Sequence, residues 1–310
     1  MGRGRGQWTV GRMPDLTGKV VVVTGASSGI GLEAARRFSR SGADTILACR
    51  SEGRGRRALL GIKSEEPGAR VRLMELDLGS LQSIERFARE FSECNSHLDV
   101  LVNNAGIMAV PYSRTADGFE SQMGTNHLGH FALTGRLLDT LVSTPGARVV
   151  TVSSNAHRMA QIDFDNLLYE KGGYSAWGAY FRSKLANLLF TYELRRRFEH
   201  AGVDTLALAA HPGSVATNLG AHFFRRRWLR PLRALIHGLL QDPGMGALPI
   251  LRASVDPAAR GGQYFGPDGL LGQRGFPVVV ASTPASHDRR AAHSLWQASE
   301  RLTGVKYLSV

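Results

Sequence analysis

The segment from Val20 to Gly31, VVVVTGASSGIG, constrains the fold more than any other part of the chain. Four consecutive β-branched residues predict a strand buried on both faces, as in a parallel sheet covered by helices. Gly25, Gly29 and Gly31 allow a tight turn and a close approach of the backbone to a ligand. The helix predicted over 29–41 would direct its first amides at a phosphate. We therefore interpret the turn as the pyrophosphate cradle of a dinucleotide; the alternative is an ordinary strand-to-helix turn.

An alternation of strands and helices continues along the chain. Further strands are predicted over 44–50, 70–78, 98–106, 147–153 and 203–210, and further helices over 51–66, 80–93, 118–142 and 176–200. A seventh strand is expected near 261–266 and a closing helix over 286–302. Short connections between these elements favour a doubly wound parallel sheet of six to seven strands with helices on both faces. Residues 15–310 are thus predicted to form one α/β domain, after a flexible basic arm over 1–14.

Composition narrows the classes of function. The chain of 310 residues has a formal net charge of +12, and only five of its 38 basic residues are lysine. No basic motif with interleaved aromatic residues occurs, so no nucleic-acid partner is predicted. No apolar run long enough to span a membrane is present. The two cysteines, Cys49 and Cys94, indicate no disulfide framework and fit a reducing cytoplasm. No metal site is predicted.

The end of the second predicted strand bears on the choice of cofactor. Ligands of such a sheet bind beyond the carboxyl ends of its strands. An acidic residue at this position would bind the ribose of NAD, whereas an arginine accommodates the 2′-phosphate of NADP. Arg50 stands there, so the sequence favours NADP over NAD, with Arg54 and Arg56 as further candidates. A solvated arginine is the alternative.

Two other strand ends are also predicted to contact the cofactor. Asp77 and Leu78 are expected beside the adenine ring, and Asp77 is equally a candidate cap of the next helix. Asn104, Ala105 and Gly106 follow the fourth strand, where small residues allow close approach to a ribose. A plain turn is the alternative at that position.

Tyr180 and Lys184 are four residues apart on a predicted helix and therefore share a face. We expect the ammonium to lower the pKa of the phenol, which makes Tyr180 a general acid for carbonyl reduction and a general base for alcohol oxidation. Ser154, at the end of the fifth strand, is placed to donate a hydrogen bond to the substrate oxygen. Asn126, within 118–142, is expected to hold a water that relays protons to Lys184, or else to be a surface amide.

Together these motifs resemble the short-chain dehydrogenase/reductase superfamily. The resemblance is carried by TGASSGIG, NNAG at 103–106, Asn126, Ser154, Tyr180-x-x-x-Lys184 and the HPGSVAT of 211–217. The segments ACR, NHLGHF and SKLANLLF are similar to the retinol-dehydrogenase-like branch, which includes the WW-domain-containing oxidoreductases. The resemblance implies a Rossmann fold and a catalytic tetrad of Asn126, Ser154, Tyr180 and Lys184. The cofactor-binding residues that it supports are Gly25, Ser27, Ser28, Gly29, Ile30, Gly31, Arg50, Asp77, Leu78, Asn104, Ala105, Gly106, Tyr180, Lys184, Pro212, Gly213, Val215 and Thr217.

The function implied by the resemblance is NADP-dependent hydride transfer to or from an alcohol or carbonyl group of an apolar substrate, such as a retinoid, a steroid or a lipid aldehyde. The alternative is a non-catalytic NADP-binding scaffold or sensor. Two features depart from the branch. Ser27 and Ser28 stand where many NADP-preferring members carry a basic residue, so the choice of NADP depends on Arg50. Animal members usually carry an N-terminal membrane anchor, and no such apolar run is seen here.

The region after the sixth strand is expected to form a substrate lid over 216–242. Its segment 222–240 has five arginines, no acidic residue and apolar residues near helical spacing. We expect either peripheral contact with an anionic membrane or a helix packed on its own domain. By resemblance, 118–142 and 176–200 are expected as the faces of a homodimer or homotetramer.

Overall fold

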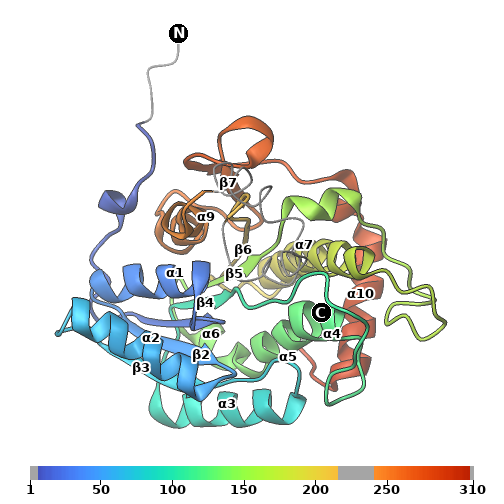
Figure 1. Cartoon of the computed structure of the whole chain (residues 1–310), viewed down its shortest axis with the longest axis horizontal. Helices are drawn as coiled ribbons and strands as arrows, with labels where there is room; N and C mark the ends of the chain where they lie inside the picture. Colours follow the sequence, from blue (N-terminus) through green and yellow to red (C-terminus); the bar gives the residue numbers. More distant parts are fainter. Residues whose placement is uncertain (1–5, 216–240, 308–310) are drawn as a thin grey trace, which may run out of the picture.

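An eight-stranded sheet lies between two layers of helices in the computed structural model, which describes residues 6–215 and 241–307 (Figure 1). Its strand order is β3-β2-β1-β4-β5-β6-β7-β8; β1 to β7 are parallel and β8 is antiparallel. The strands are β1 (Val20–Thr24), β2 (Asp44–Cys49), β3 (Val71–Glu75), β4 (Val100–Asn103), β5 (Arg148–Val152), β6 (Leu206–Ala210), β7 (Tyr264–Pro267) and β8 (Pro277–Val279). The predicted doubly wound parallel sheet is confirmed, and β8 is an addition to it. The order reverses between β1 and β4, which is where such sheets bind ligands.

Each face of the sheet is covered by its own helices. The larger helices are α1 (Gly29–Arg40), α2 (Glu52–Glu65), α3 (Leu81–Cys94), α5 (Gly129–Arg136), α6 (Leu138–Ser143), α7 (Ala176–His200), α9 (Pro243–Val255) and α10 (Arg289–Thr303). Val21 and Val23 pack in an apolar cluster with α1, α2 and α9, whereas Val20 and Val22 pack in a second cluster with α3, α5, α7 and α10. Alternate residues of a strand point to opposite faces, so four consecutive valines serve both cores.

The continuous helix predicted over 118–142 is wrong. The segment instead contains the short α4 (Ser121–Met123), a π-helical stretch over Gly124–Leu128, α5 and α6. In the π-helical stretch the Gly129 amide bonds to the Gly124 carbonyl, one residue further than in an α-helix. π-Helical turns are frequent at functional sites, and this one contains Asn126.

Helix α9 was missing from the predicted elements. Its sequence, PGMGALPILRASV, carries two prolines and two glycines, residue types that normally interrupt helices. Pro243 lies in the first turn, where its missing N–H would have no partner within the helix. Asp242 is the N-cap of α9, and its side chain accepts a hydrogen bond from the Gly244 amide. A Cβ at Gly246 would collide with Val215, so the glycine allows close packing.

The expectation of a loose arm over 1–14 is wrong at Trp8. This indole is only 5% exposed and joins the cluster of α1 and α9. Burial of a side chain of this size holds the adjoining residues against the domain. Trp296 packs in the opposite cluster, and both cysteines are free thiols.

The central parts of the two helical segments expected as dimer faces are enclosed by the chain itself. Every residue from Arg182 to Leu194 of α7 is buried, as is every residue over 129–134 of α5. α10 packs against α7, and the Arg197 guanidinium of α7 stacks 4.2 Å above the Trp296 ring. These two stretches therefore offer no open face, but the ends of the segments, including Arg136, Trp177 and Arg195, are exposed, and the homodimer or homotetramer stays a prediction.

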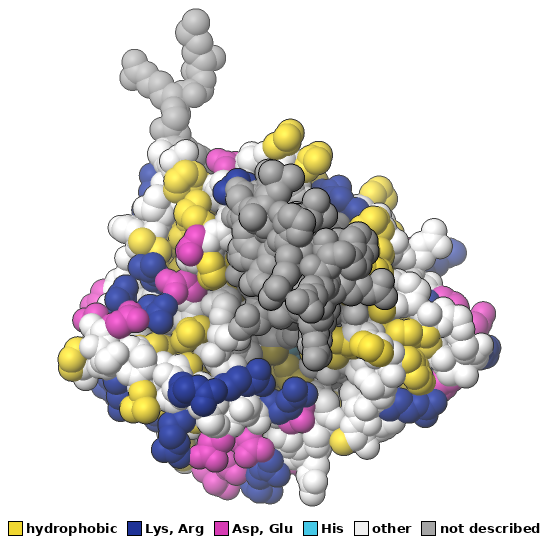
Figure 2. Space-filling model, viewed as in Figure 1, with side chains coloured by type: hydrophobic (Ala, Val, Ile, Leu, Met, Phe, Trp, Pro, Cys, Tyr) yellow, Lys and Arg dark blue, Asp and Glu magenta, His cyan; other side chains and the backbone are white. Residues whose placement is uncertain are grey.

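The arginines of α1 form ion pairs with nearby glutamates. Arg36, Arg37 and Arg40 form ion pairs with Glu33 on α1 and Glu65 on α2. Figure 2 shows basic and acidic side chains mixed over this part of the surface. In the described parts of the chain, no helix combines the length and apolar character needed to cross a membrane. The segment 222–240 and Thr217 lie outside the described residues.

Candidate functional site

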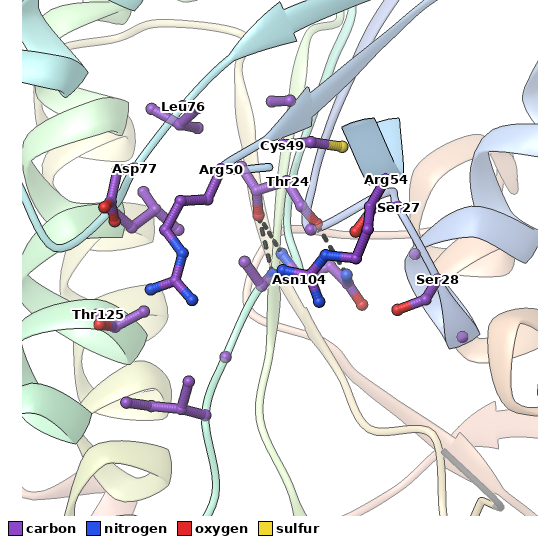
Figure 3. Close-up of a pocket in the computed structure, with 18 of the residues that line it drawn as sticks. Thr24, Ser27, Ser28, Cys49, Arg50, Arg54, Leu76, Asp77, Asn104 and Thr125 are labelled. Atoms are coloured by element: carbon purple, nitrogen blue, oxygen red, sulfur yellow. Dashed lines mark hydrogen bonds between the residues drawn. The ribbon is translucent and has the colours of Figure 1, made fainter. Parts of the chain in front are cut away.

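A cavity of about 290 Å³ opens beyond the carboxyl ends of β1 to β4, at the point where the strand order reverses (Figure 3). Twelve of the residues expected to bind a cofactor line it: Gly25, Ser27, Ser28, Gly29, Ile30, Gly31, Arg50, Asp77, Leu78, Asn104, Ala105 and Gly106. Thr24, Cys49, Ile107 and Thr125 also line it, and the sequence did not predict them to bind a cofactor. The motifs of four separate βα connections thus meet in one cavity.

The glycines of the first turn are required by geometry. Gly25 and Gly29 have φ angles of +68° and +61°, which residues with a side chain rarely adopt. A Cβ on Gly31 would lie 2.7 Å from the Gly25 carbonyl oxygen and would also collide with the Asn104 amide. The N-cap of α1, Ser28, makes no side-chain capping bond. The first amides of α1 are therefore available to bind an anion.

Thr24 holds the second loop of the cavity against the first. Its hydroxyl oxygen accepts hydrogen bonds from the backbone amides of Asn104 and Ala105, both at 2.9 Å. The Asn104 side chain donates to the Thr24 carbonyl at 2.8 Å (Figure 3). These bonds hold the small residues of 104–106 close to the glycine turn, where they form part of the cavity wall.

Two arginines reach the cavity from the end of β2 and the start of α2. Arg50 and Arg54 line it, and their guanidinium groups extend toward its interior in Figure 3. Within 6–215 and 241–307, neither forms an ion pair with a carboxylate. Arg56, the third candidate, instead pairs with Glu52 at 2.7 Å on the exposed side of α2. Two unpaired cations at this position can bind a phosphate group.

Asp77 does not cap α3, so that alternative is wrong. Ser80 is the N-cap, and it accepts a hydrogen bond from the Ser83 amide. Asp77 lines the cavity, where one of its carboxylate oxygens accepts a 2.9 Å bond from the Gly79 amide.

Lys184 and Asn126 lie next to Gly106, although Asn126, Ser154, Tyr180 and Lys184 are not among the residues that line the cavity in the described parts of the chain. A Cβ on this glycine would lie 3.6 Å from Lys184 Nζ and 3.1 Å from Asn126 Oδ1. A side chain at residue 106 would therefore lie against both groups. Lys184 Nζ donates to the Val152 carbonyl at 3.1 Å, and burial lowers the pKa of Lys184 to about 8.

Tyr180 and Ser154 stand next to this lysine. Burial raises the pKa of the Tyr180 phenol, and a hydrogen bond with Ser154 opposes the rise. Lys184 Nζ lies 5.7 Å from the centroid of the phenol ring and is turned toward Val152. The expected lowering of the phenol pKa by Lys184 is therefore wrong for the protein without ligand. Tyr180 is a neutral phenol at physiological pH, which suits it to donate a proton.

Asn126 is fully buried, so its interpretation as a surface amide is wrong. Its Oδ1 accepts from the Ile107 amide at 2.8 Å, and its Nδ2 donates to the Ile107 carbonyl and to Ser183 Oγ, each at 2.9 Å. The Ser183 hydroxyl donates in turn to the Tyr180 carbonyl at 2.8 Å. The amide thus ties the loop after Gly106 to the helix that carries Tyr180 and Lys184.

The segment after β6 lies beside the β7–β8 connection. Gly213 has a φ angle of +70°, and the Ser214 amide donates to the Gln273 carbonyl at 2.9 Å. Val215 forms a β-bridge with Gln241. Pro212, Gly213 and Val215 are not among the residues that line the cavity in the described parts of the chain.

Buried histidines predict how stability depends on pH. Burial lowers the pKa of His130 to about 4 and that of His127 and His211 to about 3, from 6.5. The unfolded chain therefore binds protons more readily, and the free energy of unfolding falls as pH drops from about 6.5 toward 4. For His130 alone, the loss is about 3 kcal/mol. Urea denaturation at pH 7.0 and 5.0 measures the effect; equal midpoints at both pH values would contradict it.

Comparisons with known proteins agree with this geometry. The sequence matches the family model for short chain dehydrogenases over residues 19–228. It is 48% identical over 291 residues to human retinol dehydrogenase 11, covering 94% of this chain and 87% of that protein. It is 40% identical over 303 residues to human retinol dehydrogenase 13, covering 95% and 87%.

Solved structures show the same similarity. The crystal structure of an uncharacterised protein from Mycobacterium paratuberculosis superposes with a TM-score of 0.80 at 40% identity, covering 98% of this chain and all of that one. A short chain dehydrogenase from Shigella flexneri complexed with NADP superposes with a TM-score of 0.63 at 25% identity, covering 82% of this chain and 98% of that one.

Proposed function

The chain belongs to the short-chain dehydrogenase family, and from that membership we propose that it uses NADP(H) to transfer a hydride to or from an alcohol or carbonyl group of an apolar substrate. The family and its retinol dehydrogenase relatives make it an NAD(P)-dependent oxidoreductase acting on CH–OH groups. One observation carries the finer proposal: Tyr180, Ser154 and Lys184 lie together beside Gly106, which lines a cavity with the glycine turn and with two arginines that form no ion pair within the described residues.

The residues of the cavity fit an NADP molecule part by part. The uncapped start of α1 would bind the pyrophosphate. Arg50 and Arg54 would bind the 2′-phosphate, and Asp77 with Leu78 would lie beside the adenine. Asn104 to Gly106 and Lys184 would hold the nicotinamide ribose. We assign contact with the nicotinamide amide to Pro212, Gly213, Val215 and Thr217.

The side chains at the Gly106 end divide the work of proton transfer. When bound, the nicotinamide supplies or accepts the hydride. The Tyr180 phenol donates a proton to the carbonyl oxygen during reduction and accepts one during oxidation. The Ser154 hydroxyl donates a hydrogen bond to the same oxygen while negative charge develops there. Lys184, held by the Val152 carbonyl, would bind the nicotinamide ribose, and Asn126 ties the loop after Gly106 to α7.

Replacing Arg50 or Arg54 with serine is expected to raise the KM for NADPH by about 10- to 100-fold, since hydrogen bonds to charged groups contribute about 1.5–3 kcal/mol. The KM for NADH should change little, because NADH lacks the 2′-phosphate. Arg56→Ser is the control, as Arg56 pairs with Glu52 on the exposed side of α2. A wild-type preference for NADH, or equal effects of all three variants, would reject the choice of NADP.

Apolar surface next to the reacting groups supports an apolar substrate. The Trp177 ring is 41% exposed and lies 6.2 Å from the Tyr180 ring, centroid to centroid. Met159, at the end of the 3₁₀ helix that Ser154 caps, is 67% exposed. We propose a retinoid, a steroid or a lipid aldehyde as the substrate class.

The test is NADPH oxidation with all-trans-retinal, a steroid ketone and a long-chain aldehyde, each compared with acetaldehyde. The proposal expects kcat/KM to rise with apolar surface. Tight NADPH binding without turnover of any of these carbonyls would favour a non-catalytic scaffold or sensor instead.

A further inference from the structure

The broken helix around Asn126 carries a buried histidine, His130, that the proposed chemistry does not use. His130 is 1% exposed and lies four residues after Asn126. Its Nδ1 is 3.0 Å from the Asn126 backbone carbonyl, and its Nε2 is 2.9 Å from Thr24 Oγ1. One imidazole therefore connects the π-helical stretch to the residue that supports the cofactor loop.

The partners of this ring determine where its proton lies. A carbonyl oxygen only accepts hydrogen bonds, so His130 Nδ1 must carry the proton and donate it to Asn126. Burial lowers the pKa of His130 to about 4, so the ring is neutral at physiological pH. A neutral imidazole has one N–H, which leaves Nε2 as a bare acceptor facing Thr24.

The hydrogen bonds of Thr24 fit this assignment. Its oxygen already accepts from the Asn104 and Ala105 amides, which use both lone pairs. The hydroxyl has a single proton to donate. Thr24 Oγ1 lies 2.9 Å from His130 Nε2 and 3.3 Å from the Val102 carbonyl oxygen. The hydroxyl therefore donates to His130, and its lone pairs face the two amides of the loop.

We propose that His130, as the neutral Nδ1–H tautomer, is a positioning residue of the dehydrogenase site: it couples the Asn126 carbonyl to the Thr24 hydroxyl and so holds the loop of Asn104 and Ala105 in place for the nicotinamide ribose. This role rests on the proposed function. His130 touches neither substrate nor cofactor in it, and acts through Thr24 and Asn126.

A second histidine of the same segment provides the matched control. His127 is equally buried, but its Nε2 bonds to Ser299 Oγ on α10 at 2.9 Å. Because the Ser299 hydroxyl donates to the Leu295 carbonyl, it accepts from His127, and this bond leads away from the cavity. Loss of either ring removes a buried imidazole from the same broken helix, and only one of them is bonded to Thr24.

The test is a double-mutant cycle on NADPH affinity, measured by fluorescence titration with the full chain. His130→Leu and Thr24→Val are each expected to raise the NADPH Kd about tenfold. The double variant should raise the Kd by no more than about threefold beyond Thr24→Val alone, because the two residues act through the same series of hydrogen bonds. Thr24→Ser, which keeps the hydroxyl, should stay near the wild type. His127→Leu should lower the Tm but leave the Kd within about twofold.

Three results would overturn the role of His130: effects that multiply fully in the double variant, an equal rise in Kd for His127→Leu, or no rise for Thr24→Val. A wild-type chain that does not bind NADPH would reject the proposed function itself, and this role with it. Should His130→Leu not fold, ¹⁵N-histidine NMR of the unmodified protein at pH 6 decides. The proposal expects a neutral ring protonated at Nδ1, and protonation at Nε2 would exclude it.

Discussion

Replacing Tyr180 with phenylalanine is expected to reduce kcat for carbonyl reduction by about 10²–10⁴-fold, the usual contribution of a positioned general acid. The substitution removes only the phenol oxygen, which the hydrogen bond with Ser154 places among the reacting groups. The ring and its packing beside Trp177 remain. The Kd for NADPH should therefore stay within about twofold, because a group that acts mainly in the transition state contributes little to ground-state binding.

Tyr192→Phe is the matched control for this loss. Tyr192 lies on the same helix and is buried, and its hydroxyl bonds to Ser282 at 2.8 Å, away from the cavity. Steady-state NADPH oxidation and fluorescence titration are measured for both variants. Turnover retained by Tyr180→Phe would reject its role in proton transfer, and a parallel loss of NADPH binding would indicate that the residue supports the cofactor site instead.

Replacing Gly31 with alanine is expected to raise the NADPH Kd by 100-fold or more. The added Cβ would lie 2.7 Å from the Gly25 carbonyl and would also press on the Asn104 side chain, so both loops of the cradle must move. Overpacking of this kind costs about 1–3 kcal/mol of stability. Loss of two phosphate hydrogen bonds, at about 1.5 kcal/mol each, already corresponds to more than 100-fold in affinity.

Gly61→Ala separates this effect from a general response to alanine. Gly61 lies within α2, and a Cβ there meets no atom within 4 Å. Alanine is the better helix former by about 1 kcal/mol, so this variant should be as stable as the wild type or more so. Thermal unfolding and NADPH titration compare the two glycines; wild-type affinity in Gly31→Ala would show that the turn does not form the pyrophosphate cradle.

Local sequence signals predicted the sheet and the cofactor side of the site. The run Val20 to Val23 reads as a buried strand because each valine packs on one of two cores. Gly25 and Gly31 indicate a close approach of two backbone segments. Gly25 adopts a positive φ angle, and a side chain on Gly31 would collide with its neighbours. Such signals lie within a few residues of one another and need no tertiary information.

The errors came from contacts that are distant in sequence. Asn126 looked like a residue of a regular helix, because its partners Ile107 and Ser183 are 19 and 57 positions away. Lys184 was expected to act on the Tyr180 phenol, but the Val152 carbonyl, 32 positions away, holds its ammonium. The burial of α7 depends on its packing against α10, which follows about a hundred residues later in the sequence. The sequence of α7 alone does not identify α10 as the helix that packs on it.

Hydride transfer itself is the most direct measure of the central claim. The full chain is incubated with NADPH deuterated at the transferring position of C4 and with an apolar aldehyde, and the alcohol product is analysed by mass spectrometry. The account predicts one deuterium on the carbinol carbon, formed by the wild type and by Tyr192→Phe but lost with Tyr180→Phe. An alcohol without deuterium, or deuterium transfer that is undiminished in Tyr180→Phe, would contradict it.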